Sequence, residues 1–401
     1  MTMKVRVLFV AAVILAEMWL VGCGHYTCGE TFGNSSCSSS NGGLNQGNGN
    51  TTKGVNLLIA DAGGIQGLVV DPTAKTIKTN PAYNGTQVQV DTRVVGDWMV
   101  IAGQKFMYTG YTATGEIWGW SLNGNGTLNA ITGAQPLSTD YLASITSAGS
   151  QAMVANPAGT LLFALDQAGE AVNVYQIGTA GALTGPTQTL LPSGFRPYNL
   201  AVDGHGTYLY VSNIVGLQTT EVAIYSIGSS GALAAVGTPV ASAVQQMQGE
   251  ATGKFMIGTS GGYFNSADNH LYIESIGSGG ALTETTATTQ DVPVTVQVQP
   301  NTGGTLVYAF DLPLTNAGGA GPIEGFTLDA SAGTLTAISG MSAAGANGAF
   351  DASGKYFFEV IYSNSTSSTL NGFDVSASPD LSSLLATVGW SSGAWAAYDA
   401  Q

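Results

Sequence analysis

Residues 172–183 read VNVYQIGTAGAL and contain the pattern that decides the fold. An apolar residue is followed by an aromatic residue, a second apolar residue, a glycine turn and a leucine. The same order returns at intervals of about fifty residues in 117–128, 222–233, 271–282, 323–335 and 370–381, with Glu274 replacing the aromatic residue once. One such unit cannot bury its apolar face alone, so the repetition predicts a stack or ring of similar units.

A turn signature precedes the hairpin and completes the repeated unit. Asp203-Gly204-His205-Gly206 leads into an apolar run, and Asn156, Glu250 and Asp351 hold the place of Asp203 in other copies. Such side chains and glycine favour tight turns, so we interpret these acids as turn formers rather than catalytic groups. Each unit is therefore predicted to be strand, turn, strand, longer loop, strand, glycine turn, strand. The absence of a sustained helical period makes the fold class all-β.

The two ends of the repeat region are complementary. Residues 54–77 contain the second, third and fourth strands of a unit, and residues 394–399 resemble a first strand with no unit behind it. Joining them closes a ring and removes unpaired strand edges. We therefore expect residues 54–401 to form one seven-bladed β-propeller, closed by the C-terminal strand joining the N-terminal blade. A solenoid is the alternative, and it would not need complementary ends.

The N-terminus is predicted to be an export signal and a tether. Lys4 and Arg6 precede a short apolar run, which is typical of a secretory signal and too short to span a membrane as a helix. The ending Leu20-Val21-Gly22-Cys23 resembles the bacterial lipobox, which implies that residues 1–22 are removed and Cys23 is lipidated. An ordinary cleaved signal with an unmodified Cys23 is the alternative. The lipoprotein interpretation places the protein in the cell envelope, periplasmic or surface-facing, and makes the membrane its partner through an acyl anchor.

The other two cysteines and the spacer fit an exported protein. Cys28 and Cys37 remain if Cys23 is lipidated, and this pair is a plausible disulfide in an oxidising compartment. Two thiols with only His25 nearby make a poor metal site, so no metal is expected. Residues 23–53 are rich in Ser, Gly and Asn, which predicts a flexible tether.

Composition excludes several classes of partner. The chain has 25 acidic residues against 10 Lys and Arg, for a formal net charge of −15. Nucleic acid is therefore not an expected partner. Since no phosphate-binding loop, catalytic triad or EF-hand pattern is visible, no cofactor is expected either.

One segment resembles a known family. Residues 196–203, RPYNLAVD, followed by 206–213, GTYLYVSN, resemble the lactonase-type propellers, also called YVTN-repeat or 6-phosphogluconolactonase-like propellers. The resemblance implies a β-propeller and, as one activity, hydrolysis of a sugar lactone. Enzymatic members place a histidine beside an arginine on this kind of segment, whereas Arg196 is followed here by Pro197, Tyr198 and Asn199.

Two functional hypotheses follow from these residues. The first is a module that binds an unknown small molecule or protein, with Arg196, Tyr198, Asn199, His270 and Asp311 as candidate ligand-binding residues. We favour it because acid and base residues are scarce. The alternative is a lactone hydrolase in which a cation such as Arg196 stabilises the oxyanion and a carboxylate such as Asp311 activates water. No catalytic residue is assigned.

Overall fold

The computed structural model describes residues 54–61, 64–81, 98–111, 116–132, 137–138, 153–166, 169–195, 197–215, 219–244, 246–260, 270–288, 293–299, 306–311, 321–341, 343–345, 347–364, 367–390 and 396–399. The predicted signal and tether, with Cys23, Cys28 and Cys37, lie outside the described residues, as does Arg196. Within the described ranges, no helix is long and apolar enough to cross a membrane.

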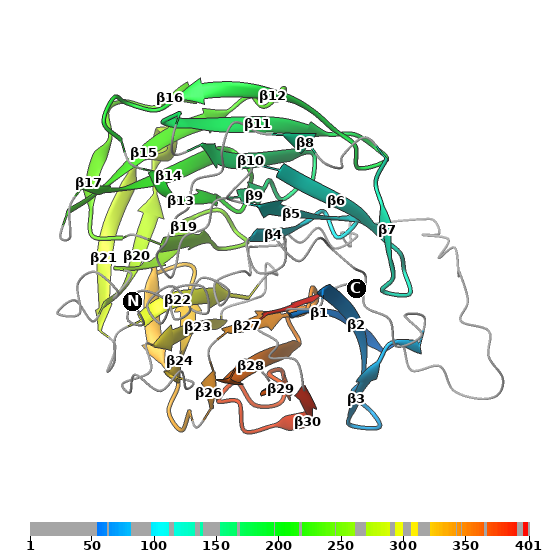
Figure 1. Ribbon diagram of the computed structural model, residues 1–401. Coiled ribbons are helices and arrows are strands. Elements are labelled where there is room, and N and C mark those ends of the chain that lie inside the picture. The colour runs from blue at the N-terminus through cyan, green and yellow to red at the C-terminus, as the bar shows by residue number, and fades with distance from the viewer. Residues whose placement is uncertain are drawn as a thin grey trace, which may run out of the picture.

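Seven small antiparallel sheets form a ring, which confirms the predicted all-β, seven-bladed propeller (Figure 1). We number the sheets as blades 1 to 7. Blade 1 contains β4 (Trp98–Ala102), β5 (Phe106–Tyr111), β6 (Glu116–Leu122), β7 (Leu128–Ala130) and β8 (Leu137–Ser138). Blade 2 contains β9 (Met153–Ala155), β10 (Leu161–Asp166), β11 (Ala171–Ile177) and β12 (Leu183–Leu190). Blade 3 contains β13 (Pro197–Val202), β14 (Tyr208–Val215), β15 (Thr219–Ile227), β16 (Leu233–Ala235) and β17 (Val240–Ser242).

The remaining blades repeat this order. Blade 4 contains β18 (Gln246–Gly249), β19 (Phe255–Thr259), β20 (His270–Ile276), the 3₁₀ turn η2 (Ser278–Gly280) and β21 (Leu282–Thr288). Blade 5 contains β22 (Pro293–Val298), β23 (Leu306–Asp311), β24 (Gly321–Asp329), β25 (Thr334–Ala337) and β26 (Ala344–Gly345). Blade 6 contains β27 (Asn347–Phe350), β28 (Tyr356–Asn364), β29 (Ser367–Asp374) and β30 (Leu384–Trp390). Blade 7 contains β31 (Ala396–Asp399), β1 (Val55–Asp61), β2 (Gly64–Asp71) and β3 (Thr76–Thr79).

Ring closure occurs where the complementary ends predicted it. β31 pairs antiparallel with β1, in a register that runs from Leu57 opposite Asp399 to Ala60 opposite Ala396. The last described strand of the chain is thus the innermost strand of the blade that contains the first (Figure 1). A solenoid would lack this pairing.

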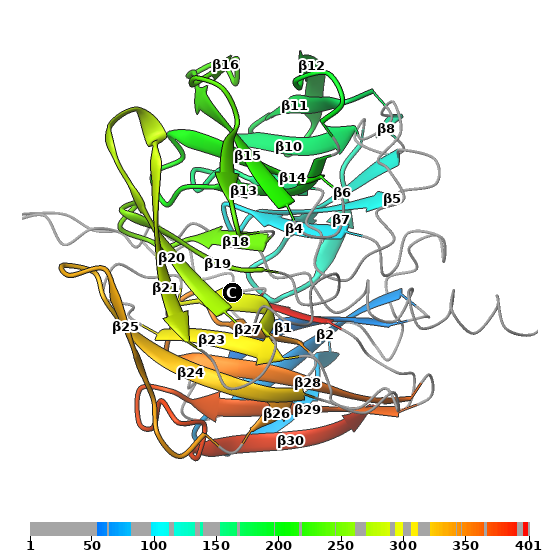
Figure 2. The ribbon, with the colours of Figure 1, turned by 90° about the vertical axis from the view of Figure 1, so that its left-hand side faces the viewer.

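Each blade is a meander, so its connections open alternately on two faces of the ring (Figure 2). One face carries the loops between the second and third strands of each blade and the connections between blades, and we call it the loop face. The other end carries the turns between first and second and between third and fourth strands, and we call it the turn face.

The turns of neighbouring blades pack closely on the turn face. Gly159, at φ +64°, lies against Gly103 of blade 1, and a Cβ there would meet the Gly103 Cα at 2.6 Å. Only glycine allows both this backbone conformation and this approach.

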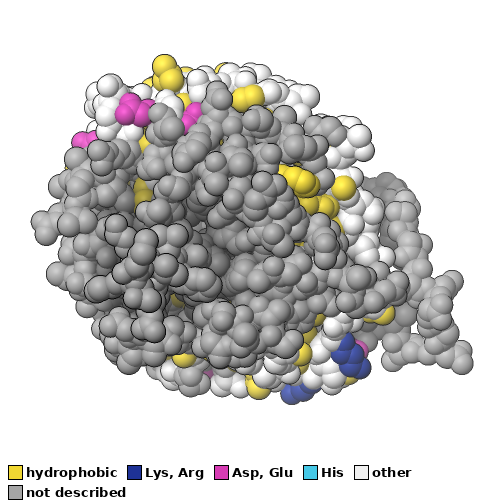
Figure 3. Space-filling model, in the orientation of Figure 1, with side chains coloured by type: hydrophobic (Ala, Val, Ile, Leu, Met, Phe, Trp, Pro, Cys, Tyr) yellow, Lys and Arg dark blue, Asp and Glu magenta, His cyan; other side chains and the backbone are white. Residues whose placement is uncertain are grey.

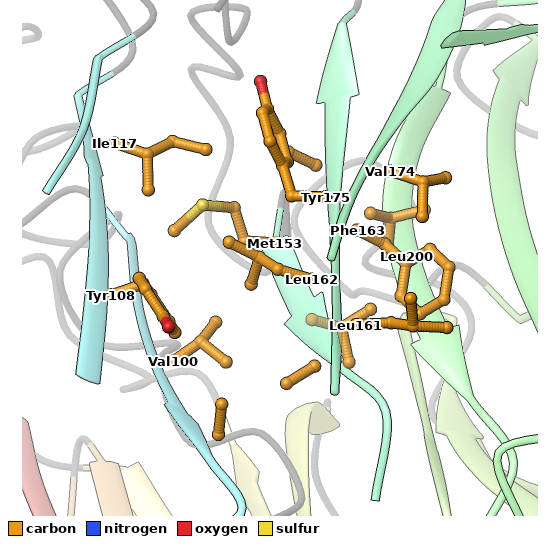
Figure 4. Close-up of a cluster of buried hydrophobic side chains, with 14 of the residues drawn as sticks. Val100, Tyr108, Ile117, Met153, Leu161, Leu162, Phe163, Val174, Tyr175 and Leu200 are labelled. Carbon is orange, nitrogen blue, oxygen red and sulfur yellow. The ribbon is translucent and has the colours of Figure 1, made fainter. Parts of the chain in front are cut away.

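The hydrophobic core lies between adjacent blades. One cluster joins blades 1, 2 and 3 through side chains such as Tyr108, Met153, Phe163 and Leu200, all of which are buried (Figure 4). Burying a Leu or Phe of this kind contributes about 1.5–3 kcal/mol. The repeated apolar positions of the sequence are therefore the blade-to-blade contacts.

Three tyrosines form hydrogen bonds that join blade 1 to blade 2, blade 3 to blade 4, and blade 5 to blade 6. The Tyr108 hydroxyl of blade 1 donates to the Gly181 carbonyl of blade 2 at 2.7 Å. Tyr210 of blade 3 donates to Gly280 of blade 4 at 3.1 Å, and Tyr308 of blade 5 donates to Pro379 of blade 6 at 2.8 Å. Each bond joins a second strand of an odd-numbered blade to the turn between the third and fourth strands of the next blade.

The outer strands alternate in the same way. In blades 1, 3 and 5 the fourth strand is split into two pieces that both pair with the third strand, whereas in blades 2, 4 and 6 it is continuous. Blades 1 to 6 therefore alternate between two forms, and blade 7, whose fourth strand β3 is continuous, does not continue the alternation.

Candidate functional site

Polar side chains occupy the same place on four consecutive blades at the loop face. In blades 2 to 5, the second strand begins with five residues of mostly apolar character, and the next residue is Asp166, Asn213, Ser260 and Asp311 in turn. Ser260 directly follows β19, and the other three belong to their strands. These residues are only 2%, 2%, 2% and 4% exposed. Since the second strand runs from the turn face to the loop face, all four lie at the loop end of their blades.

The first strands add two amides at this end. Asn199 is 1% exposed and lies opposite Ser212, and Gln246 is 7% exposed and lies opposite Thr259. First strands of neighbouring blades lie side by side around the centre of the ring (Figure 1). We call Asp166, Asn199, Asn213, Gln246, Ser260 and Asp311 the loop-face polar set.

The structure places four of the five predicted ligand-binding residues. Asn199 and Asp311 belong to the loop-face polar set, in blades 3 and 5. His270 is the half-buried first residue of β20 in blade 4. Tyr198 is 3% exposed and belongs to the hydrophobic cluster between blades. These residues share the loop end of three adjacent blades, and their role in binding stays a prediction, as does that of Arg196.

Sequence reasoning missed Asp166, Asn213, Gln246 and Ser260. For Asp166, Asn213 and Ser260 the signal was present: aligning the second strands of the repeats shows a polar residue directly after five mostly apolar ones in each of these blades.

The acids assigned to turns do form turns. Asp203 Oδ1 accepts from the Thr207 and Tyr208 amides at 2.6 Å each, and Oδ2 accepts from the His205 amide at 3.1 Å. Glu250 accepts the amides of Thr252, Lys254 and Phe255 in the same way. His205 itself is exposed on the turn face, at the opposite end of the blade from Asn213.

Two loop carboxylates are held by backbone donors at the loop face. The Gly169 amide donates to Asp166 Oδ1 at 2.7 Å. The Gly194 amide, in the connection between blades 2 and 3, donates to Glu170 Oε2 at 3.1 Å. These contacts fix the positions of both carboxylates at the loop face.

Glu274 is a buried acid away from this set. It is 2% exposed and stands where other blades have aromatic residues. Its Oε1 accepts from Ser242 Oγ of blade 3 at 2.9 Å, and no hydrogen-bond partner is found for its Oε2 within the described part of the chain. Burial raises the pKa of Glu274 to about 7; the Ser242 hydrogen bond opposes this shift, and the charge of Glu284 on the neighbouring strand adds to it.

No metal centre emerges from the described residues, which contain no group of three or more His, Cys, Asp or Glu side chains able to hold an ion.

Glu274 and Glu284 are opposite each other on β20 and β21, and like charges in this position are unfavourable. The pair therefore bears on the stability of the fold.

Comparison with solved structures supports the fold. The chain is similar to a candidate 6-phosphogluconolactonase from Bacteroides uniformis, with a TM-score of 0.61 and 13% identity over 86% of this chain and 99% of that one. A candidate 6-phosphogluconolactonase from Bacteroides fragilis gives a TM-score of 0.58 and 15% identity over 86% and 99% of the two chains. A periplasmic gluconolactonase from Pseudomonas aeruginosa gives a TM-score of 0.57 and 15% identity over 86% of this chain and 98% of that one. The chain has the propeller fold of these lactonase-like proteins.

At the level of sequence, no family model and no curated protein matches the chain. At identities of this size, structural similarity establishes the fold and leaves the activity to be argued from the site.

Proposed function

We propose that this protein is a lipid-anchored propeller of the cell envelope that binds a small-molecule or protein ligand at its loop face. The observation that carries the proposal is the loop-face polar set, in which four consecutive blades place a buried polar side chain at the same strand position. Buried strand positions are usually apolar, so repeated polar residues distinguish this end of the blades from the rest of the core. Propellers commonly host ligands on such a face because loops from several blades converge.

The second candidate function is hydrolysis of a sugar lactone, and the similarity to three lactonase-like structures favours it. In this reaction water attacks the lactone carbonyl carbon, the ring C–O bond breaks, and the ring oxygen takes a proton to give the open hydroxy acid. Asp311 or Asp166 would act as the base that takes the proton of water, and a donor or cation such as Arg196 would stabilise the oxyanion.

The binding proposal is tested by calorimetry and thermal unfolding of the purified protein with a panel of hexoses and aldonolactones. Asn213→Ala and Gln246→Ala should weaken any binding by about tenfold or more, since removing a good polar contact is worth about 1.4 kcal/mol. His205→Ala on the turn face is the matched control and should bind as the unmodified protein does. Equal binding by all four proteins would contradict the assignment of the site.

The hydrolase proposal is tested with the same lactones, after spontaneous ring opening has been subtracted. Turnover that falls at least a hundredfold in Asp311→Asn or Asp166→Asn, with His205→Ala unchanged, would establish an enzyme. No turnover above the spontaneous rate in the unmodified protein would rule this activity out for the panel and leave binding as the function.

The proposed anchor has its own test. Expressed in a bacterium with the lipoprotein pathway, the full chain should fractionate with membranes and incorporate a radiolabelled fatty acid. Cys23→Ala should lose the label and leave the membrane fraction. A label retained by Cys23→Ala would show that Cys23 is not the acylated residue.

A further inference from the structure

The chain enters the propeller on the turn face. β1 is the second strand of blade 7, and its first residue, Val55, is opposite Val70 near the end of β2. The turn between β2 and β3 follows directly, so Val55 lies beside one of the turns that define this face. A Cβ at Gly54 would meet the Val70 carbonyl oxygen at 2.9 Å, so Gly54 lies against the same end of the blade. The segment that precedes Gly54 therefore joins the domain on the turn face.

The lysines of the described ranges project from this face or lie next to it. Lys105, Lys254 and Lys355 lie in turns between first and second strands, and Lys75 lies in the turn between β2 and β3. Lys78 follows on β3, and all five side chains are exposed. In the view of Figure 3, the lysine side chains that can be seen lie at the rim, near the place of β3 in Figure 1. Positive charge is thus present in the same blade that the chain enters.

The carboxylates of the turn face are held within their turns. Asp203, Glu250 and Asp351 are buried, and each accepts backbone amides of its own turn. The acids of the turns between third and fourth strands accept backbone amides in the same way, and they are Asp71, Asp329, Asp374 and Asp380. A lysine instead carries its charge at the end of a flexible four-carbon stem. The ammonium groups can therefore extend beyond the turns, whereas these carboxylates remain in them.

An anionic bilayer surface is the partner that fits these observations. The attraction of a lysine to anionic lipid is weak and falls off within a Debye length, and the net charge of −15 opposes binding of the chain as a whole. A lipid anchor changes this balance. A Ser- and Gly-rich tether of about 30 residues spans about 30 Å on average, which keeps the turn face within reach of the surface and favours even a weak contact.

We infer that the turn face is the membrane-facing surface of this protein, with its lysines against anionic lipid headgroups and its loop face directed away from the bilayer. The inference rests on the proposed lipid anchor and adds the orientation of the domain to it. In this orientation the loop-face polar set lies on the side from which a ligand diffuses, so ligand binding does not compete with the membrane.

Acylation of lysines by a water-soluble N-hydroxysuccinimide ester measures this orientation, with the rate at each lysine read by mass spectrometry of peptides. The lipidated full chain is labelled on vesicles of phosphatidylethanolamine and phosphatidylglycerol. The Cys23→Ala chain is labelled in the presence of the same vesicles and serves as the unanchored reference. Ser193→Lys adds a matched reporter to both proteins, because Ser193 is exposed in the connection between blades 2 and 3 on the loop face.

Anchoring should change the rates on one face only. Lys75, Lys105, Lys254 and Lys355 should react about fivefold more slowly in the anchored protein than in the reference, as expected for a weak contact with anionic lipid. The lysine introduced by Ser193→Lys should react at the same rate in both. The slowing should diminish on vesicles of phosphatidylcholine alone and at high salt, because the attraction is then removed or screened.

The outcomes separate the orientation from the anchor on which it rests. Slower reaction of the introduced lysine, with the turn-face lysines unchanged, would place the loop face on the membrane and overturn the inference. Equal rates in the anchored and reference proteins would overturn it too, because the domain would then have no membrane-facing surface. Equal slowing on anionic and phosphatidylcholine vesicles would overturn the assignment of anionic headgroups as the partner. Absence of a fatty-acid label from the unmodified chain would contradict the anchor itself, and the inference with it.

Discussion

Replacing Glu274 with Gln should make this protein more stable at neutral and alkaline pH. Glu274 is 2% exposed at the junction of blades 3 and 4, where its Oε1 accepts from Ser242 Oγ. Gln has nearly the shape of a protonated Glu and carries no charge at any pH, so it can keep the bond from Ser242. The substitution therefore isolates the effect of ionisation.

The magnitude follows from the pKa. Burial raises the pKa of Glu274 from 4.5 to about 7, with the Glu284 charge as a smaller contribution in the same direction. Between these values the unfolded chain has lost the proton while the folded protein retains it, so the free energy of unfolding falls as pH rises. At 1.36 kcal/mol per unit, the loss amounts to about 3 kcal/mol by pH 8 and changes little above that. Below about pH 4.5 both states hold the proton and the difference disappears.

Denaturant unfolding between pH 4.5 and 8.5, followed by tryptophan fluorescence, measures this effect. Glu274→Gln should match the unmodified protein near pH 4.5 and exceed it by about 3 kcal/mol at pH 8. Glu284→Gln is the control, because it removes an equal charge beside Glu274 but leaves the burial; most of the pH dependence should remain. Identical pH profiles for Glu274→Gln and the unmodified protein would refute the reasoning.

Four other predictions follow from the packing of the blades. Glu359→Gln should also stabilise at pH 8, because burial raises the pKa of Glu359 to about 7 as well; an unchanged denaturation midpoint at pH 8 would contradict this. Tyr210→Phe should lower the free energy of unfolding by about 1 kcal/mol, because it removes the hydrogen bond to Gly280. The ring without its hydroxyl should still fit, since Phe163 holds the equivalent strand position in blade 2. Asp203→Ala should lower the free energy of unfolding by about 2–3 kcal/mol, because it leaves three backbone amides without their acceptor. Asp203→Asn should lower it clearly less, and equal losses in the two variants would mean that the turn does not depend on those bonds. Ending the chain after Trp390 removes β31 and exposes the edge of β1. Circular dichroism and gel filtration should then show an unfolded or aggregated protein. A compact, native-like monomer would show that ring closure is dispensable.

The parts of the structure that depend on local pattern could be predicted from the sequence. The glycine turns, the apolar strands and the complementary ends sufficed for the seven blades and for the pairing of β31 with β1. Glu274 could be recognised as an exception because five sister positions are aromatic. The roles of Asp203 and Glu250 followed from turn chemistry, which acts over a few residues.

Features that depend on contacts between blades could not be predicted in this way. The partners of Tyr108, Tyr210 and Tyr308 are carbonyls of a neighbouring blade, 73, 70 and 71 residues away in the chain. The pKa of Glu274 is raised by burial and lowered in part by the hydrogen bond from Ser242, which comes from a different blade. The candidate site is likewise assembled from residues of several blades, so sequence reasoning recovered Asp311 and Asn199 but not their neighbours in the loop-face polar set.

Hydrogen–deuterium exchange with and without a ligand tests the central claim most directly, because it reports which face a ligand covers. The purified protein would be measured with the tightest-binding member of the hexose and aldonolactone panel. We predict slower exchange at the loop ends of β10, β14, β19 and β23, around Asp166, Asn213, Ser260 and Asp311, with no change in the turns around His205 and Lys254. Protection confined to the turn face, or no member of the panel binding at all, would contradict the account.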